Sequence, residues 1–188
     1  MTRAVPLQAR PPAPVDSRTA GFTMVELIVV IILVGILSAI GVSRFFDRTP
    51  YDAAGFAEQA RAMVRYAQKL AVAQNRPVYV QGAMDGVGLC FDAATPCPAA
   101  SQVPAPSGEN SGSAATRKYC GGSKLWYCEG WPAGVTMMPV SGTMAPFFFD
   151  ALGRPGVASG SFTGLTVTIS GGGVSNQISI AQETGYVY

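Results

Sequence analysis

One acidic side chain stands alone in the most apolar stretch of the sequence, and its position suggests chemistry. Glu26 is the only charged residue between Phe22 and Val42. As a helix, residues 22–42 would be about 31 Å long, close to the thickness of the hydrocarbon core of a bilayer. A carboxylate at the centre of such a helix costs about 2.5–3.5 kcal/mol on insertion scales, so we expect Glu26 to have a partner.

A new amine at Phe22 would supply that partner. Cleavage of the bond between Gly21 and Phe22 would create the amine, and Phe22 precedes Glu26 by one turn of a helix. The ammonium group would then neutralise the carboxylate. The simpler alternative is an ordinary signal anchor in which Glu26 has no special role.

Other catalytic or metal-binding chemistry finds little support. The chain has no histidine, which excludes Ser-His-Asp and Cys-His sites and imidazole ligands. Asp85, Asp92 and Asp150 do not follow the calcium-loop pattern and are better interpreted as turn residues. The glycines at 171–173 follow a predicted strand but precede no helix, which indicates a hairpin turn and not a phosphate-binding loop. We expect no enzymatic activity, no metal and no cofactor.

The four cysteines, Cys90, Cys97, Cys120 and Cys128, all follow the apolar segment. Their spacing matches no common zinc pattern, so they indicate two disulfides in an oxidising compartment. We favour Cys90–Cys97 with Cys120–Cys128, because each pair closes a short, turn-rich loop. The sequence alone leaves the crossed pairings open.

Charge is distributed unevenly along the chain. The formal net charge is +2, and it arises in residues 1–21, where Arg3, Arg10 and Arg18 outnumber Asp16. A basic segment before an apolar helix predicts a cytoplasmic N-terminus and a single membrane crossing. The acidic and basic residues after position 21 balance, so this part has no general attraction for nucleic acid.

A second cleavage site competes with the first. Residues 39–41 (Ala-Ile-Gly) resemble a small-x-small site for ordinary signal peptidase, and cleavage there would release a soluble product. Glu26 near the start of the apolar stretch and the long basic segment before it argue against this site.

The elements that position these residues follow from periodicity. Between Tyr51 and Asn75, apolar residues recur at three- and four-residue steps, which predicts an amphipathic helix that Pro77 ends and Pro50 kinks or interrupts near its start. Residues 92–116 are predicted to form a long surface loop. The period of two after Pro77 predicts short strands at 78–81, 87–91, 124–128, 135–138, 147–149, 165–169 and 176–180. One helix before serial strands predicts an α+β fold, with the helix covering one face of an antiparallel sheet.

Arg61, Arg65 and Lys69 form a basic line along one face of the predicted helix. With Trp126, Tyr127 and Trp131 as stacking surfaces, they could bind DNA, as a DNA-uptake receptor would need to do. The simpler interpretation is a solvated helix face together with aromatic core residues.

Residues 21–42 resemble the processing and methylation motif of type IV prepilins and type II secretion pseudopilins. The resemblance rests on Gly21 at the cut, Phe22 after it, Glu26 four residues further on, and the apolar helix. It implies that a prepilin peptidase cleaves after Gly21 and that Phe22 is N-methylated. It also implies that Glu26 forms an assembly salt bridge with the amine of an adjacent subunit.

Shorter motifs narrow the resemblance. Residues 66–71, 131–135 and 149–155 look like the minor pseudopilin group that contains GspH and FimT. Residues 45–47, together with 66–71, are also similar to the MshC component of mannose-sensitive haemagglutinin (MSHA) pili. The division this implies is a cleaved leader (1–21), a transmembrane and filament-core helix (22–42), its amphipathic continuation (43–76) and a β-rich globular domain (77–188).

The resemblance implies a non-enzymatic minor pilin or pseudopilin that helps to assemble an MSHA-type type IV-like filament, at or near its tip. The implied partners are other pilin subunits, the prepilin peptidase and methyltransferase, the inner-membrane assembly platform and inner-membrane lipid. The chain would cross the inner membrane once, with its C-terminal domain in the periplasm, before it joins the pilus. The alternatives are a pseudopilin of type II secretion and a DNA-binding minor pilin of a DNA-uptake pilus.

Overall fold

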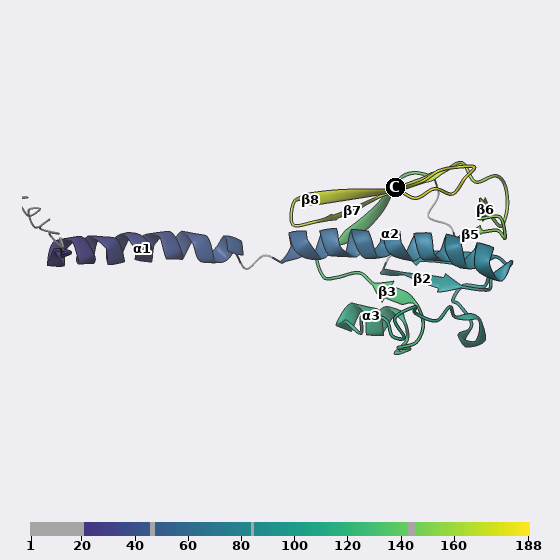
Figure 1. Ribbon diagram of the computed structural model, residues 1–188, viewed down its shortest axis with the longest axis horizontal. Coiled ribbons are helices and arrows are strands. Elements are labelled where there is room, and N and C mark those ends of the chain that lie inside the picture. Colours follow the sequence, from purple (N-terminus) through teal and green to yellow (C-terminus); the bar gives the residue numbers. More distant parts are fainter. Residues whose placement is uncertain (1–20, 46–47, 84, 143–145) are drawn as a thin grey trace, which may run out of the picture. The chain divides into compact units, whose positions relative to one another are not determined.

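The computed structural model describes residues 21–45, 48–83, 85–142 and 146–188. The chain divides into two units, residues 1–45 and residues 46–188. Helix α1 (Met24–Phe45) lies in the first unit, and helix α2 (Thr49–Gln74) opens the second (Figure 1). No helix in the part of the chain that the structure describes combines the length and the apolar character needed to cross a membrane.

Helix α1 begins directly after Thr23. The Thr23 hydroxyl accepts a hydrogen bond from the Glu26 N–H at 3.2 Å, and the Thr23 carbonyl accepts one from the Leu27 N–H at 3.1 Å. A threonine that bonds the N–H three residues ahead is a typical N-cap. The sequence pattern placed the start of this helix at Phe22. In the structure the helix starts two residues later, at Met24.

Helix α2 has its own start and stop. Pro50 lies in its first turn, where the missing N–H of proline is no handicap, so it stands at the start of a separate helix, in keeping with the predicted interruption. Asn75 follows the last turn in the left-handed conformation, with φ 51°, and its N–H caps a carbonyl of the helix. The end predicted from Asn75 to Pro77 agrees with this geometry.

The strands of the described residues form two antiparallel sheets. The first has the spatial order β3-β2-β1-β5-β6, with β1 Val78–Ala83, β2 Gly86–Cys90, β3 Cys128–Gly130, β5 Phe147–Phe149 and β6 Pro155–Val157. The second has the order β4-β7-β8, with β4 Thr136–Ser141, β7 Leu165–Gly171 and β8 Val174–Ile180. The predicted α+β class is confirmed, but two sheets replace the single sheet that was expected.

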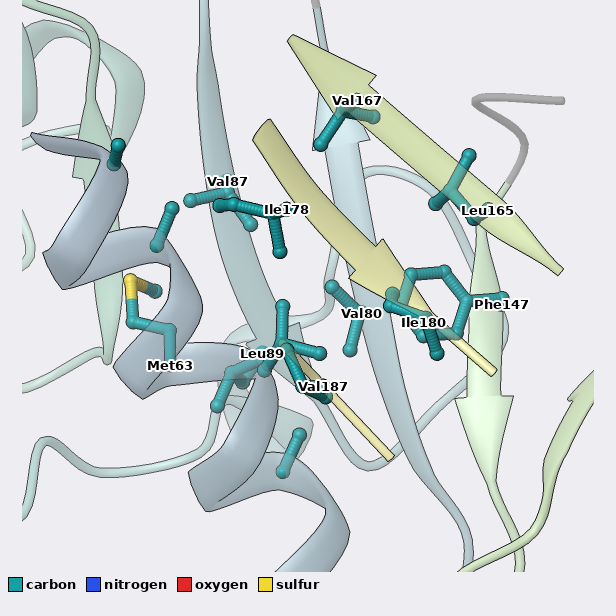
Figure 2. Close-up of a cluster of buried hydrophobic side chains, with 14 of the residues drawn as sticks. Met63, Val80, Val87, Leu89, Phe147, Leu165, Val167, Ile178, Ile180 and Val187 are labelled. Carbon is teal, nitrogen blue, oxygen red and sulfur yellow. The ribbon is translucent and has the colours of Figure 1, made fainter. Parts of the chain in front are cut away.

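Helix α2 packs against both sheets (Figure 1). Its buried face is rich in alanine, with the larger side chains of Phe56, Met63 and Val64. Figure 2 shows Met63 facing side chains from strands of both sheets, among them Leu89 and Ile178. Each large apolar side chain buried in such a core contributes about 1.5–3 kcal/mol, and alanine lets the sheets approach the helix closely.

The segment between β2 and β3 differs most from expectation. The predicted loop at 92–116 contains a 3-10 helix, Ala99–Ser101, and the start of α3, Ala114–Tyr119. Ser113 is the N-cap of α3, and its hydroxyl accepts a hydrogen bond from the N–H of Thr116 at 3.0 Å. The strand predicted at 124–128 was largely wrong, because of these residues only Cys128 belongs to β3 and Trp126 makes an isolated bridge to Pro104.

The glycines at 171–173 turn the β7–β8 hairpin, as predicted. Gly172 and Gly173 both have positive φ, 56° and 80°, which is the geometry of a two-residue hairpin turn. A Cβ on Gly172 would lie 2.4 Å from Cδ of Pro50, whereas a Cβ on Gly173 would meet nothing within 4 Å. Of the two glycines at the tip of the turn, Gly172 is therefore the one that packs against the start of α2.

Gly172→Ala should lower the free energy of unfolding by about 2–4 kcal/mol, because it combines an unfavourable φ with displacement of Pro50. Gly173→Ala is the matched control and should cost only about 1 kcal/mol, from its φ alone. Urea unfolding of the detergent-solubilised chain, followed by tryptophan fluorescence, measures both. Equal losses for the two variants would contradict the packing of Gly172 against Pro50.

Candidate functional site

The proposed cleavage site lies in exposed, non-helical chain. Gly21, Phe22 and Thr23 precede α1, and all three are exposed. A Cβ added at Gly21 would meet no atom within 4 Å. The Gly21–Phe22 bond is therefore uncovered by the rest of the described chain.

The Glu26 side chain is exposed in the first turn of α1. Its carboxylate has no hydrogen bond or ion pair within the described residues, although its backbone N–H is bonded to Thr23. From the sequence we expected Phe22 and Glu26 to lie one helical turn apart. Phe22 precedes α1, so helical geometry does not place it beside Glu26. The described residues therefore supply no cation for this carboxylate.

Helix α1 presents apolar side chains on all sides. Every residue from Phe22 to Ser38 is exposed, with Phe22 78% and Leu37 68% exposed. Soluble proteins rarely leave so large an apolar surface uncovered, which marks it as a surface for protein or membrane contact. This surface surrounds the single carboxylate of Glu26.

The predicted basic line of α2 is partly occupied by contacts within the domain. Arg65 donates from Nε and Nη2 to the Val187 carbonyl at 3.1 and 2.8 Å. Arg61 donates to the Gln177 carbonyl at 2.8 Å and pairs with Glu58. Two of the three basic side chains therefore attach α2 to β8 and to the chain after it, a role that the sequence pattern did not reveal.

The tryptophans considered for DNA stacking belong to the core or pack against it. Trp126 is buried, and its Nε1 donates to the Leu89 carbonyl at 2.8 Å. Trp131 packs edge-on against Phe56, with 6.4 Å between ring centroids. The structure thus agrees with the simpler interpretation of these residues as core.

A groove of about 680 Å³ lies beside the two disulfides. Tyr119 lines it, and burial, aided by the charge of Asp85, raises the pKa of this phenol to about 12, so it stays neutral. None of the described residues that line the groove is charged: Gln81, Gly82, Ala83, Thr95, Pro96, Cys97, Ala99, Gln102, Tyr119, Cys120, Gly121, Gly122, Ser123 and Trp126. The groove therefore offers no counter-charge for phosphate, and the described residues contain no acidic, cysteine or histidine cluster that could hold a metal ion.

The cysteines form the two pairs that were favoured from the sequence. Cys90 is bonded to Cys97 and Cys120 to Cys128, with Cα–Cα distances of 5.9 and 6.0 Å. Both bridges pack with Trp126 in one small cluster. They attach the long segment between β2 and β3 to both of these strands, through Cys90 in β2 and Cys128 in β3.

A side chain on α2 joins two of the motifs noted in the sequence. Gln68 Nε2 donates to the carbonyls of Gly153 and Thr184 at 2.8 and 2.9 Å. In the turn that contains Gly153, the carboxylate of Asp150 accepts hydrogen bonds from the N–H groups of Leu152 and Arg154 at 2.9 and 2.8 Å. The motifs at 66–71 and 149–155 therefore serve the packing of the domain.

Removal of one disulfide by the double substitution Cys90→Ser and Cys97→Ser should lower the free energy of unfolding by about 2–3 kcal/mol, since the bridge closes a short loop. Urea unfolding under non-reducing conditions measures the loss. Peptide mapping without reduction should show the two short-range pairs in the parent chain. Crossed pairs, or free thiols in exported protein, would contradict the assignment.

The turn at Asp150 should make stability depend on acidity. Partial burial by itself raises the pKa of Asp150, but the N–H groups of Arg154 and Leu152 and the Arg154 guanidinium outweigh it and lower the pKa below its ordinary value. A lowered folded-state pKa stabilises the fold above about pH 4, and this contribution is lost as the pH falls further. Asp150→Asn should therefore flatten the acid limb of the stability profile. An unchanged acid limb would contradict this.

Comparison with known proteins bears on the N-terminal segment. Residues 16–42 match the family model described as the prokaryotic N-terminal methylation motif. The chain is 39% identical over 61 residues to the type IV narrow pilus major component PilA5 of Thermus thermophilus, a match over 32% of this chain and 53% of PilA5. The chain thus spans about half the length of this curated relative.

Two crystal structures of the type IV minor pilin FimU of Pseudomonas aeruginosa are also similar, each at 24% sequence identity. The first has a TM-score of 0.46 and covers 73% of this chain and 87% of FimU. The second has a TM-score of 0.43 and covers 70% and 87%. Residues 16–42 therefore identify the chain as one that carries the prokaryotic N-terminal methylation motif, and it is similar to a type IV pilin.

Proposed function

We propose that this chain is a non-enzymatic subunit of a type IV-like filament, cleaved after Gly21 and N-methylated at Phe22. The observation that carries the proposal is the methylation motif at residues 16–42, together with an exposed Glu26 on an otherwise uncharged apolar helix. In this proposal residues 1–21 are the leader, residues 22–42 form the membrane anchor and filament core, residues 43–76 continue it as the amphipathic helix, and residues 77–188 form the outward-facing β-rich domain.

Glu26 sets the register of assembly by pairing with the amine of an adjacent subunit. Its carboxylate is exposed and has no bonded partner in the described chain, and Phe22 of the same chain lies outside the helix. Lipid and a bundle of apolar helices are similar solvents for residues 27–40. Hydrophobicity alone therefore does not determine the axial position of a subunit relative to its neighbours. An unpaired carboxylate is costly in that environment, and misaligned subunits are therefore penalised.

The chain is inserted in the inner membrane before assembly. Its basic leader stays in the cytoplasm and its C-terminal domain enters the periplasm, in keeping with two disulfides in that domain. Its partners there are the prepilin peptidase and methyltransferase, the assembly platform, lipid and other pilin subunits. Residues 22–38 offer these partners an apolar surface with no cover in the described chain.

Within this class, we assign the chain to the minor pilins of an MSHA-type filament, at or near the tip. The motifs at 66–71 and 149–155, which Gln68 joins, support the minor-pilin assignment. The type II secretion alternative shares the same N-terminal chemistry, and the genes that flank this one would separate the two systems.

The DNA-uptake alternative is weaker. Arg61 and Arg65 are bonded to backbone carbonyls of the domain, and no charged side chain of the described residues lines the large groove. Both observations remove binding groups that a DNA-binding pilin would need.

Glu26→Val tests the assembly role. This variant should be cleaved and inserted normally but recovered from sheared filaments at about a tenth of the parent level or less, because the amine of the adjacent subunit then loses its counter-charge in an apolar environment. Fractionation of sheared filaments against membranes measures recovery. Glu109→Val, which removes an exposed carboxylate from a loop of the globular domain, is the matched control and should leave recovery unchanged. Equal recovery of Glu26→Val and parent would contradict the proposed function of Glu26.

A further inference from the structure

Thr23, which caps the N-terminus of α1, also determines how far from the Gly21–Phe22 bond the helix begins. The Thr23 hydroxyl bonds the Glu26 N–H at 3.2 Å, and α1 begins at the next residue, Met24. Gly21 and Phe22 consequently remain outside the helix and exposed. Each residue by which the helix began earlier would bring its first turn closer to the Gly21–Phe22 bond.

We propose that Thr23 is a positioning residue for leader cleavage, which keeps the Gly21–Phe22 bond in extended chain by capping α1. The inference rests on the proposed function, in which a peptidase hydrolyses this bond. Water adds to the Gly21 carbonyl carbon, the bond to the Phe22 nitrogen breaks, and a carboxylate at Gly21 and an amine at Phe22 result. A protease approaches a carbonyl most easily in extended chain, because a helix encloses the peptide groups of its own backbone.

The physical effect of Thr23 comes from the hydrogen bond it satisfies. Without the hydroxyl, the N–H of Glu26 loses its acceptor close to an apolar environment, where unpaired N–H groups are costly. The nearest replacement is the carbonyl of Phe22, four residues back, which is the ordinary helical partner. That bond would draw Phe22 into the first turn of α1 and move the scissile bond to the helix end.

The chemistry of the cap separates this role from simple recognition of threonine by the peptidase. Serine and asparagine are good N-caps and differ from threonine in shape, whereas alanine is a poor one. A peptidase pocket that reads the threonine side chain would reject asparagine. A cap requires only a side-chain oxygen that reaches the N–H of Glu26.

The test follows removal of the leader from the full-length chain by pulse-chase in cells that contain the processing peptidase. Thr23→Ala should be cleaved on the order of fivefold more slowly than the parent, while Thr23→Ser and Thr23→Asn should stay within about twofold of it. Ser38→Ala is the matched control, because it removes a hydroxyl from the same helix away from the cap, and its rate should equal that of the parent.

Each result decides between the interpretations. Equal rates for Thr23→Ala and the parent would overturn the role of Thr23, and so would an asparagine variant as slow as alanine. If Thr23→Ala fails to accumulate, Thr23→Val takes its place, because valine has nearly the shape of threonine but is a poor N-cap, and it should be cleaved as slowly as is expected for alanine. A parent chain that keeps its leader would contradict the proposed function and this inference together.

Discussion

The globular unit depends on the close fit of α2 between two sheets. Alanine at positions such as 57, 60 and 67 lets strands of both sheets reach the helix, and Met63 fills the space between them. Close-packed interiors tolerate neither larger side chains nor voids at such contacts. Because this face contacts strands of both sheets, α2 is the element that holds the two sheets in one domain.

Polar contacts then fix the C-terminal part of the chain to α2. Arg61, Arg65 and Gln68 each donate to backbone carbonyls far away in sequence. Such charge-assisted or paired bonds have a defined geometry, so they set the register of β8 and the following turn along the helix. The basic face of α2 therefore stabilises the globular unit by binding the C-terminal part of the chain.

Helix α1 shows the opposite behaviour. Its apolar side chains from Phe22 to Ser38 are exposed, and Glu26 is unpaired among the described residues. An uncovered apolar surface of this size marks a site of contact with protein or membrane. The difference between the two helices explains how one chain could be both a folded domain and a filament subunit.

Local signals in the sequence were good guides to local structure. Periodicity located α2, Phe147–Phe149 and the β7–β8 hairpin, and loop length favoured the two disulfide pairs that the structure contains. The division into two sheets and the Gln68 contacts were not predictable, because they depend on residues distant in sequence. The start of α1 was within reach, since the Thr-x-x-Glu pattern at Thr23 is a known capping signal.

The central claim is that residues 1–21 are a leader and that Phe22 becomes a methylated N-terminus. Intact-mass spectrometry of the chain extracted from membranes tests it most directly. The account predicts the mass of residues 22–188 with two disulfides and one added methyl group. A mass that includes Met1, or one that begins at Val42, would contradict it.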